Sequence, residues 1–158
     1  MFFNEFIIRP ATNNDIPSIK NVVFTTLNEY GLNPQLHGKD SDLDDIERNY
    51  FVNNGYFGVT VNTRANNIVG TFGIFAINMD ICELRKMYLL KEMRGQGVGK
   101  FILNTAIKTA AEKQFRKIIL ETISPLTAAI ALYKQFGFKE VKPKEINERV
   151  DQAFELDL

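Results

Sequence analysis

The amino-acid sequence predicts an α/β (α+β) fold: one domain with a mixed β-sheet that carries helices on both faces. Segments with apolar residues at helical spacing alternate with short runs of β-branched and aromatic residues. Their order is one strand, two helices, three strands, a helix, a strand, a helix and two strands, which favours a mixed sheet. The chain has 158 residues, of which 45% are hydrophobic, and this fits one compact domain with its own core. We therefore expect a single domain over residues 1–158.

Five elements are predicted in the N-terminal half. Pro10 ends a first strand that is rich in Phe and Ile, because proline donates no backbone hydrogen bond. A polar run over 12–15 offers capping side chains for a first helix, and Gly31 ends that helix. Acidic residues over 41–45 suit the N-terminus of a second helix because of the helix dipole. The expected elements are a strand over 3–9, helices over 16–27 and 41–53, and strands over 56–61 and 68–77.

The stretch from Cys82 to Gly99, CELRKMYLLKEMRGQGVG, is the most informative in the chain. It reads as an apolar strand, a short turn, a glycine-rich loop and the start of a helix. Glycines let backbone N–H groups approach a ligand without interference from a Cβ atom. The helix start adds unpaired N–H groups and the positive end of a dipole, an arrangement that holds a phosphate or pyrophosphate. The alternative is a flexible surface turn before an ordinary helix.

Three kinds of phosphate-binding loop compete for this stretch. A P-loop needs a glycine where this chain has Arg94 and a magnesium-binding hydroxyl where it has Phe101, so a P-loop is excluded. A dinucleotide-binding fingerprint would place its acidic residue near Glu121. However, it needs its third glycine one position after Gly99, and too little chain follows to complete a doubly wound sheet. The third pattern, Arg/Gln-x-x-Gly-x-Gly/Ala, fits Arg94, Gly97 and Gly99 directly.

The strand before the loop predicts a β-bulge. Cys82 and Leu84 are apolar in one phase of the alternation, whereas Met87 and Leu89 are apolar in the other. A period of two that slips by one residue indicates an extra residue in the strand. A bulge separates a strand from its neighbour and leaves backbone groups available for a ligand. The alternative is that residues 85–86, an Arg-Lys pair, form an exposed edge.

The C-terminal half predicts two helices and three strands. An apolar face with helical period runs from Val98 to Ala110. The last helix has the clearest marks, because Ser124 suits its N-cap, Pro125 its first position and Gly137 its end. The expected strands run over 117–122, 138–141 and 153–158.

Two motifs resemble those of the GCN5-related N-acetyltransferase (GNAT) family. The loop over 94–99 resembles the family's pyrophosphate-binding loop, and the segment ALYKQFGF over 131–138 resembles its second signature, Leu-Tyr-x-x-x-Gly-Phe. The two motifs cover about Glu83 to Val141 with matching separation, while the N-terminal half agrees in layout only. The resemblance implies a GNAT-like, mostly antiparallel sheet with a bulged central strand. It also implies acetyl-CoA-dependent transfer of an acetyl group to a primary amine of a small molecule or peptide, by direct attack on the thioester.

The resemblance further implies that acetyl-CoA, as the acyl donor, contacts the bulged strand and the glycine loop, and that the first two helices line the acceptor pocket. Backbone N–H groups of the bulged strand would stabilise the oxyanion. One position departs from the family: relatives often carry Asn seven residues before the helix tyrosine, where this chain has Leu126 followed by Thr127. This departure leaves the cofactor contacts at that helix start open. The expected cofactor-binding residues are Met87, Tyr88, Leu89, Arg94, Gly95, Gln96, Gly97, Val98, Gly99 and Lys100.

Three side chains are candidates for acid–base catalysis. Tyr133 stands at the motif position of the family's usual proton donor, and a phenol with a pKa of about 10 stays protonated at neutral pH. Its alternative role is that of a core aromatic. Glu83 on the bulged strand and Glu121 at the end of the next core strand match places where relatives carry a catalytic carboxylate, and we favour Glu83 as the base. Glu83 could instead pair with Arg85 or Lys86 on an exposed face, Glu121 could cap local backbone, and the amine proton could leave through water.

Composition excludes several other functions. Lys plus Arg and Asp plus Glu both count 19, so no net positive field attracts a nucleic acid. No apolar run approaches a membrane span, and the start MFFNEFIIRP lacks the pattern of a signal peptide, so we expect a cytoplasmic protein with no membrane partner. The single cysteine, Cys82, suits a core position and excludes an internal disulfide. With His37 as the only histidine, we expect no metal site.

Two alternative functions keep the same fold. One is a transferase of a longer acyl group, and the other is a CoA-binding sensor or structural protein with no acceptor pocket. Turnover with any amine separates the enzyme from the sensor, and the preferred acyl-chain length separates the two enzymes. A homodimer is compatible with each function.

Overall fold

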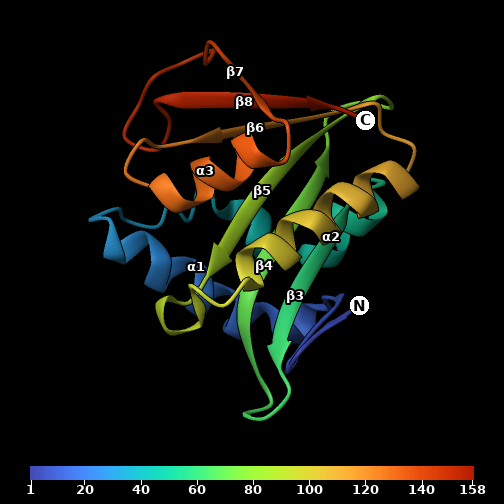
Figure 1. The fold of residues 1–158 in the computed structure, drawn as a ribbon, viewed down its shortest axis with the longest axis vertical. Helices are drawn as coiled ribbons and strands as arrows, with labels where there is room; N and C mark the ends of the chain where they lie inside the picture. Colours follow the sequence, from blue (N-terminus) through green and yellow to red (C-terminus); the bar gives the residue numbers. More distant parts are fainter.

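The computed structural model describes all 158 residues as an eight-stranded sheet with helices on both faces (Figure 1). The strand order is β1-β2-β3-β4-β5-β6-β8-β7, and only β5 and β6 pair in parallel. The mixed, mostly antiparallel sheet is therefore confirmed. The strands are β1 Phe2–Phe3, β2 Phe6–Pro10, β3 Tyr56–Asn62, β4 Asn67–Ala76, β5 Ile81–Leu89, β6 Lys117–Thr122, β7 Lys139–Val141 and β8 Gln152–Asp157. The helices are η1 Asn13–Asp15, α1 Ile16–Glu29, η2 Ser41–Asp44, η3 Glu47–Val52, η4 Lys91–Met93, α2 Val98–Glu112 and α3 Thr127–Gln135.

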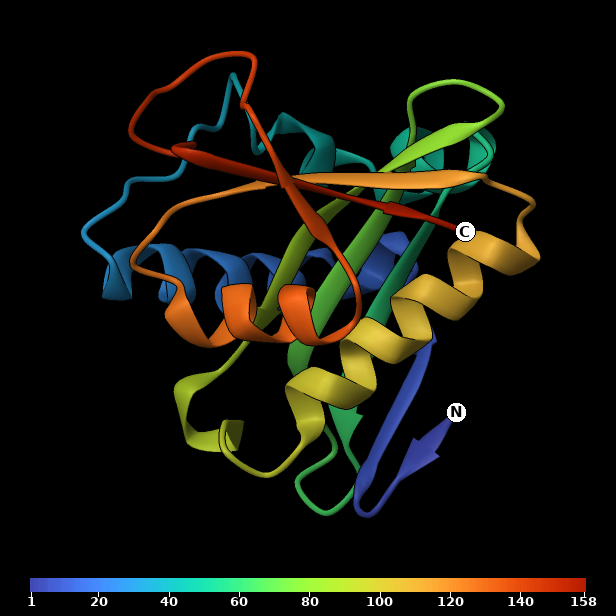
Figure 2. The same cartoon turned by 45° about the horizontal axis from the view of Figure 1, so that its top comes forward.

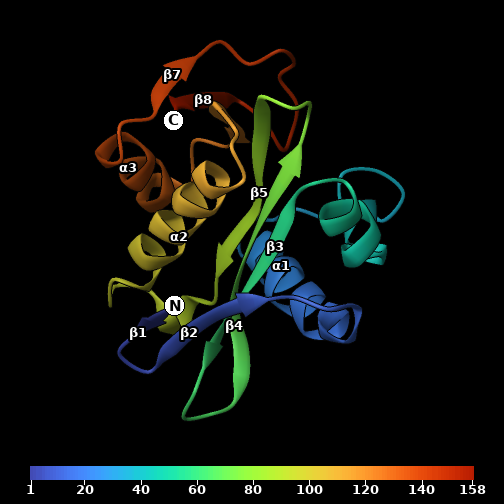
Figure 3. The same cartoon turned by 90° about the vertical axis from the view of Figure 1, so that its right-hand side faces the viewer.

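Two hydrophobic clusters fill the space on the two faces of the sheet. Helices α2 and α3 cover one face, and α1 with η3 covers the other (Figure 3). The larger cluster includes Phe72 and Phe154, and the smaller one includes Tyr50 and Phe57, all of them fully buried. Each such aromatic side chain stabilises the fold by about 1.5–3 kcal/mol through removal from water. The sheet is thereby held between two cores, which fixes β5 at its centre.

The two central strands separate after a short parallel contact. Residues 81–83 of β5 pair with residues 117–119 of β6. Beyond that contact, β5 continues on β4 as far as Leu89, while β6 pairs only with β8. Figure 2 shows β5 running down beside β4 while β6 crosses above it with β8. The sheet is therefore open on one side of β5, with backbone groups unpaired along its second half.

A β-bulge in β5 accompanies this separation and confirms the slip in the apolar pattern. Arg85 lies opposite Gly73 and Tyr88 opposite Thr71, so Lys86 and Met87 together face one residue of β4. Lys86 has a left-handed φ of 53°, and its carbonyl accepts a hydrogen bond of 2.7 Å from the Thr71 hydroxyl. Its side chain is 6% exposed. The alternative that residues 85–86 form an exposed edge is therefore wrong for Lys86, because its side chain is buried and forms ion pairs.

Three local expectations were wrong. The first strand is a hairpin of β1 and β2, because Asn4 takes a left-handed φ of 50° and turns the chain. Pro10 is the last residue of β2. The pairing of β1 with β2 does not reach it, so the lack of a backbone N–H costs no hydrogen bond to β1. The second helix is a 3₁₀ turn, η2, followed by a π-helix, η3. The last helix begins at Thr127, because Ser124 bonds the Asp151 carboxylate at 2.8 Å rather than capping it.

Candidate active site

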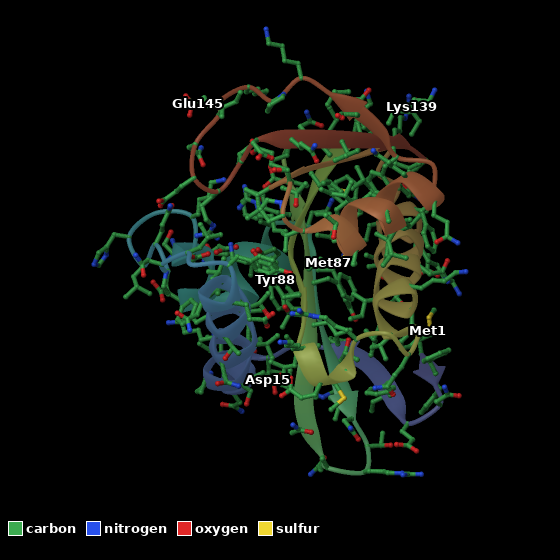
Figure 4. All side chains as sticks on the ribbon, turned by 60° about the vertical axis from the view of Figure 1, so that its left-hand side comes forward. Met1, Asp15, Met87, Tyr88, Lys139 and Glu145 are labelled. Carbon is green, nitrogen blue, oxygen red and sulfur yellow. The ribbon has the colours of Figure 1, made fainter.

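A cavity of about 600 Å³ opens where β5 and β6 separate. Its walls come from β5, the glycine loop, the start of α2, the end of β6, α3, the C-terminal end of α1 with the segment after it, and the loop before β8. Figure 4 shows Met87 and Tyr88 on β5, in the space between α1 and α3. Of the predicted site residues, Glu83, Met87, Tyr88, Leu89, Arg94, Gly95, Gly99, Glu121 and Tyr133 line this cavity. Gln96, Gly97 and Lys100 are exposed on the loop and first turn of α2, whereas Val98 is buried in the core.

The glycine loop has the geometry of an anion-binding helix start. Gly95 and Gly97 take left-handed φ values of 77° and 85°. A Cβ atom on Gly97 would lie 3.2 Å from Cζ of Phe3, so both the conformation and the space favour glycine. The first hydrogen bond of α2 runs from the Phe101 N–H to the Gly97 carbonyl, at 3.0 Å. The N–H groups of residues 98–100 therefore have no partner within the helix and can bind an anion.

Arg94, the first residue of the motif, holds this loop in place. Its guanidinium donates two hydrogen bonds to the Glu29 carboxylate, at 2.8 and 3.0 Å. It also donates two to the Leu89 carbonyl, at 2.9 and 2.8 Å. Bidentate pairing of this kind fixes orientation as well as distance. Arg94 thus ties the loop to α1 and to the end of β5, an arrangement that motif spacing alone does not reveal.

Tyr133 presents a protonated phenol at the cavity. Its ring packs against Phe138 and Phe154 with centroids 5.7 and 6.0 Å apart, and the residue is 5% exposed. Burial raises the pKa of Tyr133 well above its usual value, with a smaller contribution from Tyr88. The side chain is therefore a core aromatic whose phenol stays protonated at neutral pH.

The two candidate carboxylates lie in different surroundings. Glu83 forms an ion pair with Arg85, whose guanidinium lies 3.8 Å from the centre of the Phe75 ring. The expected alternative pairing is thus present, but in the cavity wall, where the Glu83 side chain is 17% exposed. Glu121 is exposed at the end of β6, and no ion pair engages it. Both carboxylates can reach a molecule in the cavity.

The sequence gives no sign of a charged cluster in the same cavity wall. Lys86, Asp42 and Arg149 line the cavity, and Asp40 lies behind them in contact with Lys86 and Arg149, although it is 109 residues from Arg149. The acidic residues over 41–45 predict a helix N-terminus, Asp40 lies outside that run, and no spacing relates either to β5. The one signal in the sequence that could have indicated this charged cluster is a lysine, Lys86, at the predicted bulge of an apolar strand.

Cys82 belongs to the core rather than to the cavity wall. Cys82 is fully buried, and burial raises the pKa of its thiol to about 12. No group of three or more His, Cys, Asp and Glu side chains is placed to hold a metal ion. None of the helices has the length and apolar character needed to cross a membrane.

Comparisons with known proteins identify the family. The model of the acetyltransferase (GNAT) family matches residues 23–138. The uncharacterized N-acetyltransferase YjgM of Escherichia coli K12 is 34% identical over 140 residues, which is 85% of this chain and 83% of that protein. A GNAT-family acetyltransferase of Staphylococcus aureus Mu50 is 25% identical with a TM-score of 0.87, over 96% of this chain and 98% of that one. The PaiA N-acetyltransferase of Thermoplasma acidophilum, solved in complex with coenzyme A, shares the fold with a TM-score of 0.77 and 19% identity, over 97% and 99% of the two chains. The chain described here thus belongs to the GNAT family of acetyltransferases, and it is an N-acetyltransferase enzyme.

Proposed function

We propose that this enzyme transfers the acetyl group of acetyl-CoA to a primary amine of a small molecule or peptide, by direct attack of the amine on the thioester. One observation carries the proposal: a single cavity joins the glycine loop, the unpaired half of β5 and the Tyr133 ring. In the proposed function these would serve as the anion site, the backbone donors and the proton donor, all in one space. The coenzyme A complex of the Thermoplasma relative supports the choice of donor.

The donor half of the site fits a CoA thioester. The N–H groups of residues 98–100 and the helix dipole would hold the pyrophosphate. The bulged part of β5 would hold the pantetheine arm, and N–H groups around Met87 to Leu89 would donate to the acetyl oxygen as negative charge develops there. Bound acetyl-CoA supplies the activated acetyl group. The protein supplies position and hydrogen-bond donors.

Two proton transfers complete the proposed chemistry. Tyr133 is the proton donor for the departing thiolate, because its raised pKa keeps the phenol protonated and it lines the cavity. Glu83 is our first choice for the base that accepts the amine proton, because it lies on β5 three residues before the bulge at Lys86. Glu121 approaches from the end of β6 and is the second choice. In a third possibility, water carries the proton and both carboxylates only bind the acceptor.

Calorimetric titration with acetyl-CoA and a thiol-release assay over a panel of amines test this function together. We expect acetyl-CoA to bind and at least one primary amine to release free CoA. Binding without turnover of any amine would favour the sensor over the enzyme. A higher kcat/KM with longer acyl-CoA thioesters would instead define a transferase of longer acyl groups.

A further inference from the structure

Lys86 collects three acceptor groups from the segment after α1. Its ammonium lies 3.3 Å from Oδ1 of Asp40 and 3.1 Å from Oδ1 of Asp42, and it donates a hydrogen bond of 2.9 Å to the Lys39 carbonyl. The side chains of Lys86, Asp40 and Asp42 are 6%, 0% and 8% exposed. The bulge of β5 is thereby joined directly to residues 39–42, and these residues line the cavity at 39, 41 and 42.

Arg149 brings a third segment to the same place. Its guanidinium donates one hydrogen bond of 3.1 Å to each oxygen of the Asp40 carboxylate, and its side chain is 6% exposed. The Tyr50 hydroxyl donates to the other carboxylate, that of Asp42. We call Lys86, Asp40, Asp42 and Arg149 the Lys86 cluster. Figure 2 shows its two loops meeting: the blue segment after α1 and the red segment before β8 lie on the side of the molecule away from the glycine loop.

The Lys86 cluster is neutral, internally paired and almost completely out of water. Burying four charges costs about as much solvation energy as their pairing recovers, so such a cluster contributes little net stability compared with apolar side chains of similar size. Its strength lies in directional bonds that fix which segments meet and at what distance. The cluster joins β5, the segment after α1 and the loop before β8, and all three line the same cavity. This arrangement points to a role for the Lys86 cluster in shaping the cavity.

The backbone of Lys86 connects the cluster to the reaction centre. Lys86 has a left-handed φ of 53°, a conformation that residues other than glycine adopt uncommonly. Its carbonyl accepts a hydrogen bond from the Thr71 hydroxyl. The next residues of β5, 87–89, are the region where the proposed function places the backbone donors to the acetyl oxygen. The backbone of Lys86 therefore shapes β5, the strand that would hold acetyl-CoA. Its side chain contacts the segment 39–42, which forms the cavity wall on the proposed acceptor side.

From this geometry we propose that Lys86 is a positioning residue for the acceptor amine. Its side chain anchors residues 39–42, and through Asp40 the loop of Arg149, at a fixed distance from the bulge. Its ammonium donates a hydrogen bond to the Lys39 carbonyl and lies within ion-pair distance of two carboxylates, so we assign it neither binding of the acceptor nor transfer of the amine proton. The inference rests on the proposed acetyl transfer, since it assigns the acceptor to this side of the cavity.

Two substitutions at the same position separate the side chain from the backbone. Lys86→Met removes the ammonium and keeps the strained φ, whereas Lys86→Gly removes the ammonium and relieves the strain. We expect both variants to raise the KM for the amine, with kcat/KM down roughly 10-fold or more, because small displacements of a reactant are costly. For Lys86→Met, which keeps the bulge, the dissociation constant for acetyl-CoA should stay within about twofold, since the glycine loop and the strand backbone are untouched. Arg149→Met should give the same loss, because it frees the second loop.

Lys117→Met is the matched control. Lys117 also contacts two carboxylates, those of Glu155 and Asp157, but it lies on β6 outside the cavity wall, and its substitution should leave the amine KM unchanged. All variants are assayed at saturating acetyl-CoA after their melting temperatures are measured. If Lys86→Met does not fold, Lys86→Gly and Arg149→Met decide the question.

The outcomes distinguish this inference from the proposed function. Wild-type enzyme that acetylates an amine, together with an unchanged amine KM in Lys86→Gly and Arg149→Met, would overturn the positioning role and leave the acetyl transfer intact. An equal loss of acetyl-CoA affinity and amine affinity would also overturn it, because the cluster would then be a general structural support. Wild-type enzyme that binds acetyl-CoA and acetylates no amine would remove the proposed function and this inference together.

Discussion

Tyr133 is the proposed general acid, and its ring is also part of the core. The ring packs against Phe138 and Phe154, so packing sets the direction of the hydroxyl. Burial raises its pKa, which keeps the phenol protonated at neutral pH. At the scale of single residues, one side chain therefore serves the core and, in the proposed mechanism, carries the proton that the departing thiolate takes up.

The first prediction concerns the Tyr133 hydroxyl. Tyr133→Phe keeps the ring and its contacts, so the melting temperature should change little. If the phenol is the proton donor, kcat should fall by roughly 10²-fold or more, while the dissociation constant for acetyl-CoA stays nearly the same. Steady-state kinetics and calorimetry measure the two quantities. Wild-type turnover in this variant would leave Tyr133 with a packing role only.

The second prediction compares the two carboxylates. Glu83→Gln keeps the size of the side chain and removes its basicity, so activity should fall most near neutral pH. It should recover in part in alkaline buffer, where the amine is already deprotonated. Glu121→Gln should lose less, because Glu121 is exposed at the end of β6. The measurement is a pH–rate profile of kcat/KM for each variant with one amine.

Arg85 supplies the control for this comparison. Glu83→Gln also weakens the ion pair with Arg85. Arg85→Met breaks the same ion pair but keeps the Glu83 carboxylate. Its activity should therefore show no recovery in alkaline buffer. If Glu121→Gln shows the large loss with alkaline recovery, the assignment of the base is reversed. Equal and small effects in both glutamine variants would mean that the proton leaves through water.

At the scale of elements, the glycine loop and the start of α2 form one unit. The left-handed glycines place the chain so that the first N–H groups of α2 face outward, and Arg94 ties that unit to α1 and β5. A ligand that binds this preformed unit stabilises the native state only. At a hundredfold excess over its dissociation constant the gain is about 2.7 kcal/mol.

The third prediction tests that unit by adding charge. Gly97→Glu and Gly99→Glu should each abolish the rise in melting temperature caused by acetyl-CoA, because each adds a negative charge beside the N–H groups that we propose bind the pyrophosphate. Asn104→Glu is the matched control: it adds the same charge to the exposed side of α2, away from the loop, and should keep the rise. Thermal unfolding with and without acetyl-CoA gives the result. An undiminished shift in both glycine variants would separate the loop from the donor site.

Elements were predictable from the sequence where a short local pattern determines them. The glycine loop follows from residue spacing, and the bulge follows from a slip in the apolar alternation, since both depend on neighbouring residues. The N-terminus of α3 was not predictable, because Ser124 is drawn to Asp151, a residue far along the chain. The turn at Asn4 and the π-helix η3 were missed because the apolar periodicity shows neither a left-handed turn residue nor the type of helix.

At the scale of the whole molecule, the Lys86 cluster joins parts that no local pattern relates. Asp40 lies 109 residues before Arg149 and meets it only because the sheet brings the loop before β8 over the end of α1. Burial by itself would raise the pKa of Asp40. The Arg149 guanidinium, the backbone N–H of Gln35 and the ammonium of Lys86 outweigh burial and hold that pKa below its usual value.

This lowered pKa makes part of the stability dependent on pH. A carboxyl group whose pKa is lower in the folded chain contributes stability that is present above its unfolded pKa, about 3.9. That contribution is lost as the pH falls from there through the folded pKa, because the native state must then give up the bonds to Arg149 and Lys86. The fraction of folded protein should therefore fall on acidification below about pH 4, in step with protonation of Asp40.

Asp40→Asn tests this contribution. The variant leaves two buried cations with one carboxylate, so at pH 7 the free energy of unfolding should drop by about 3–5 kcal/mol. Its stability should also vary less steeply than that of the wild type between about pH 5 and pH 2, because one depressed carboxyl no longer titrates. Asp80→Asn, in an ion pair with Arg116 whose side chain is 84% exposed, should change stability by less than about 1 kcal/mol. Urea unfolding at several pH values measures both variants. Parallel curves for Asp40→Asn and wild type would show that the ionisation of Asp40 does not support the fold, and that the contact between the two loops depends on shape rather than charge.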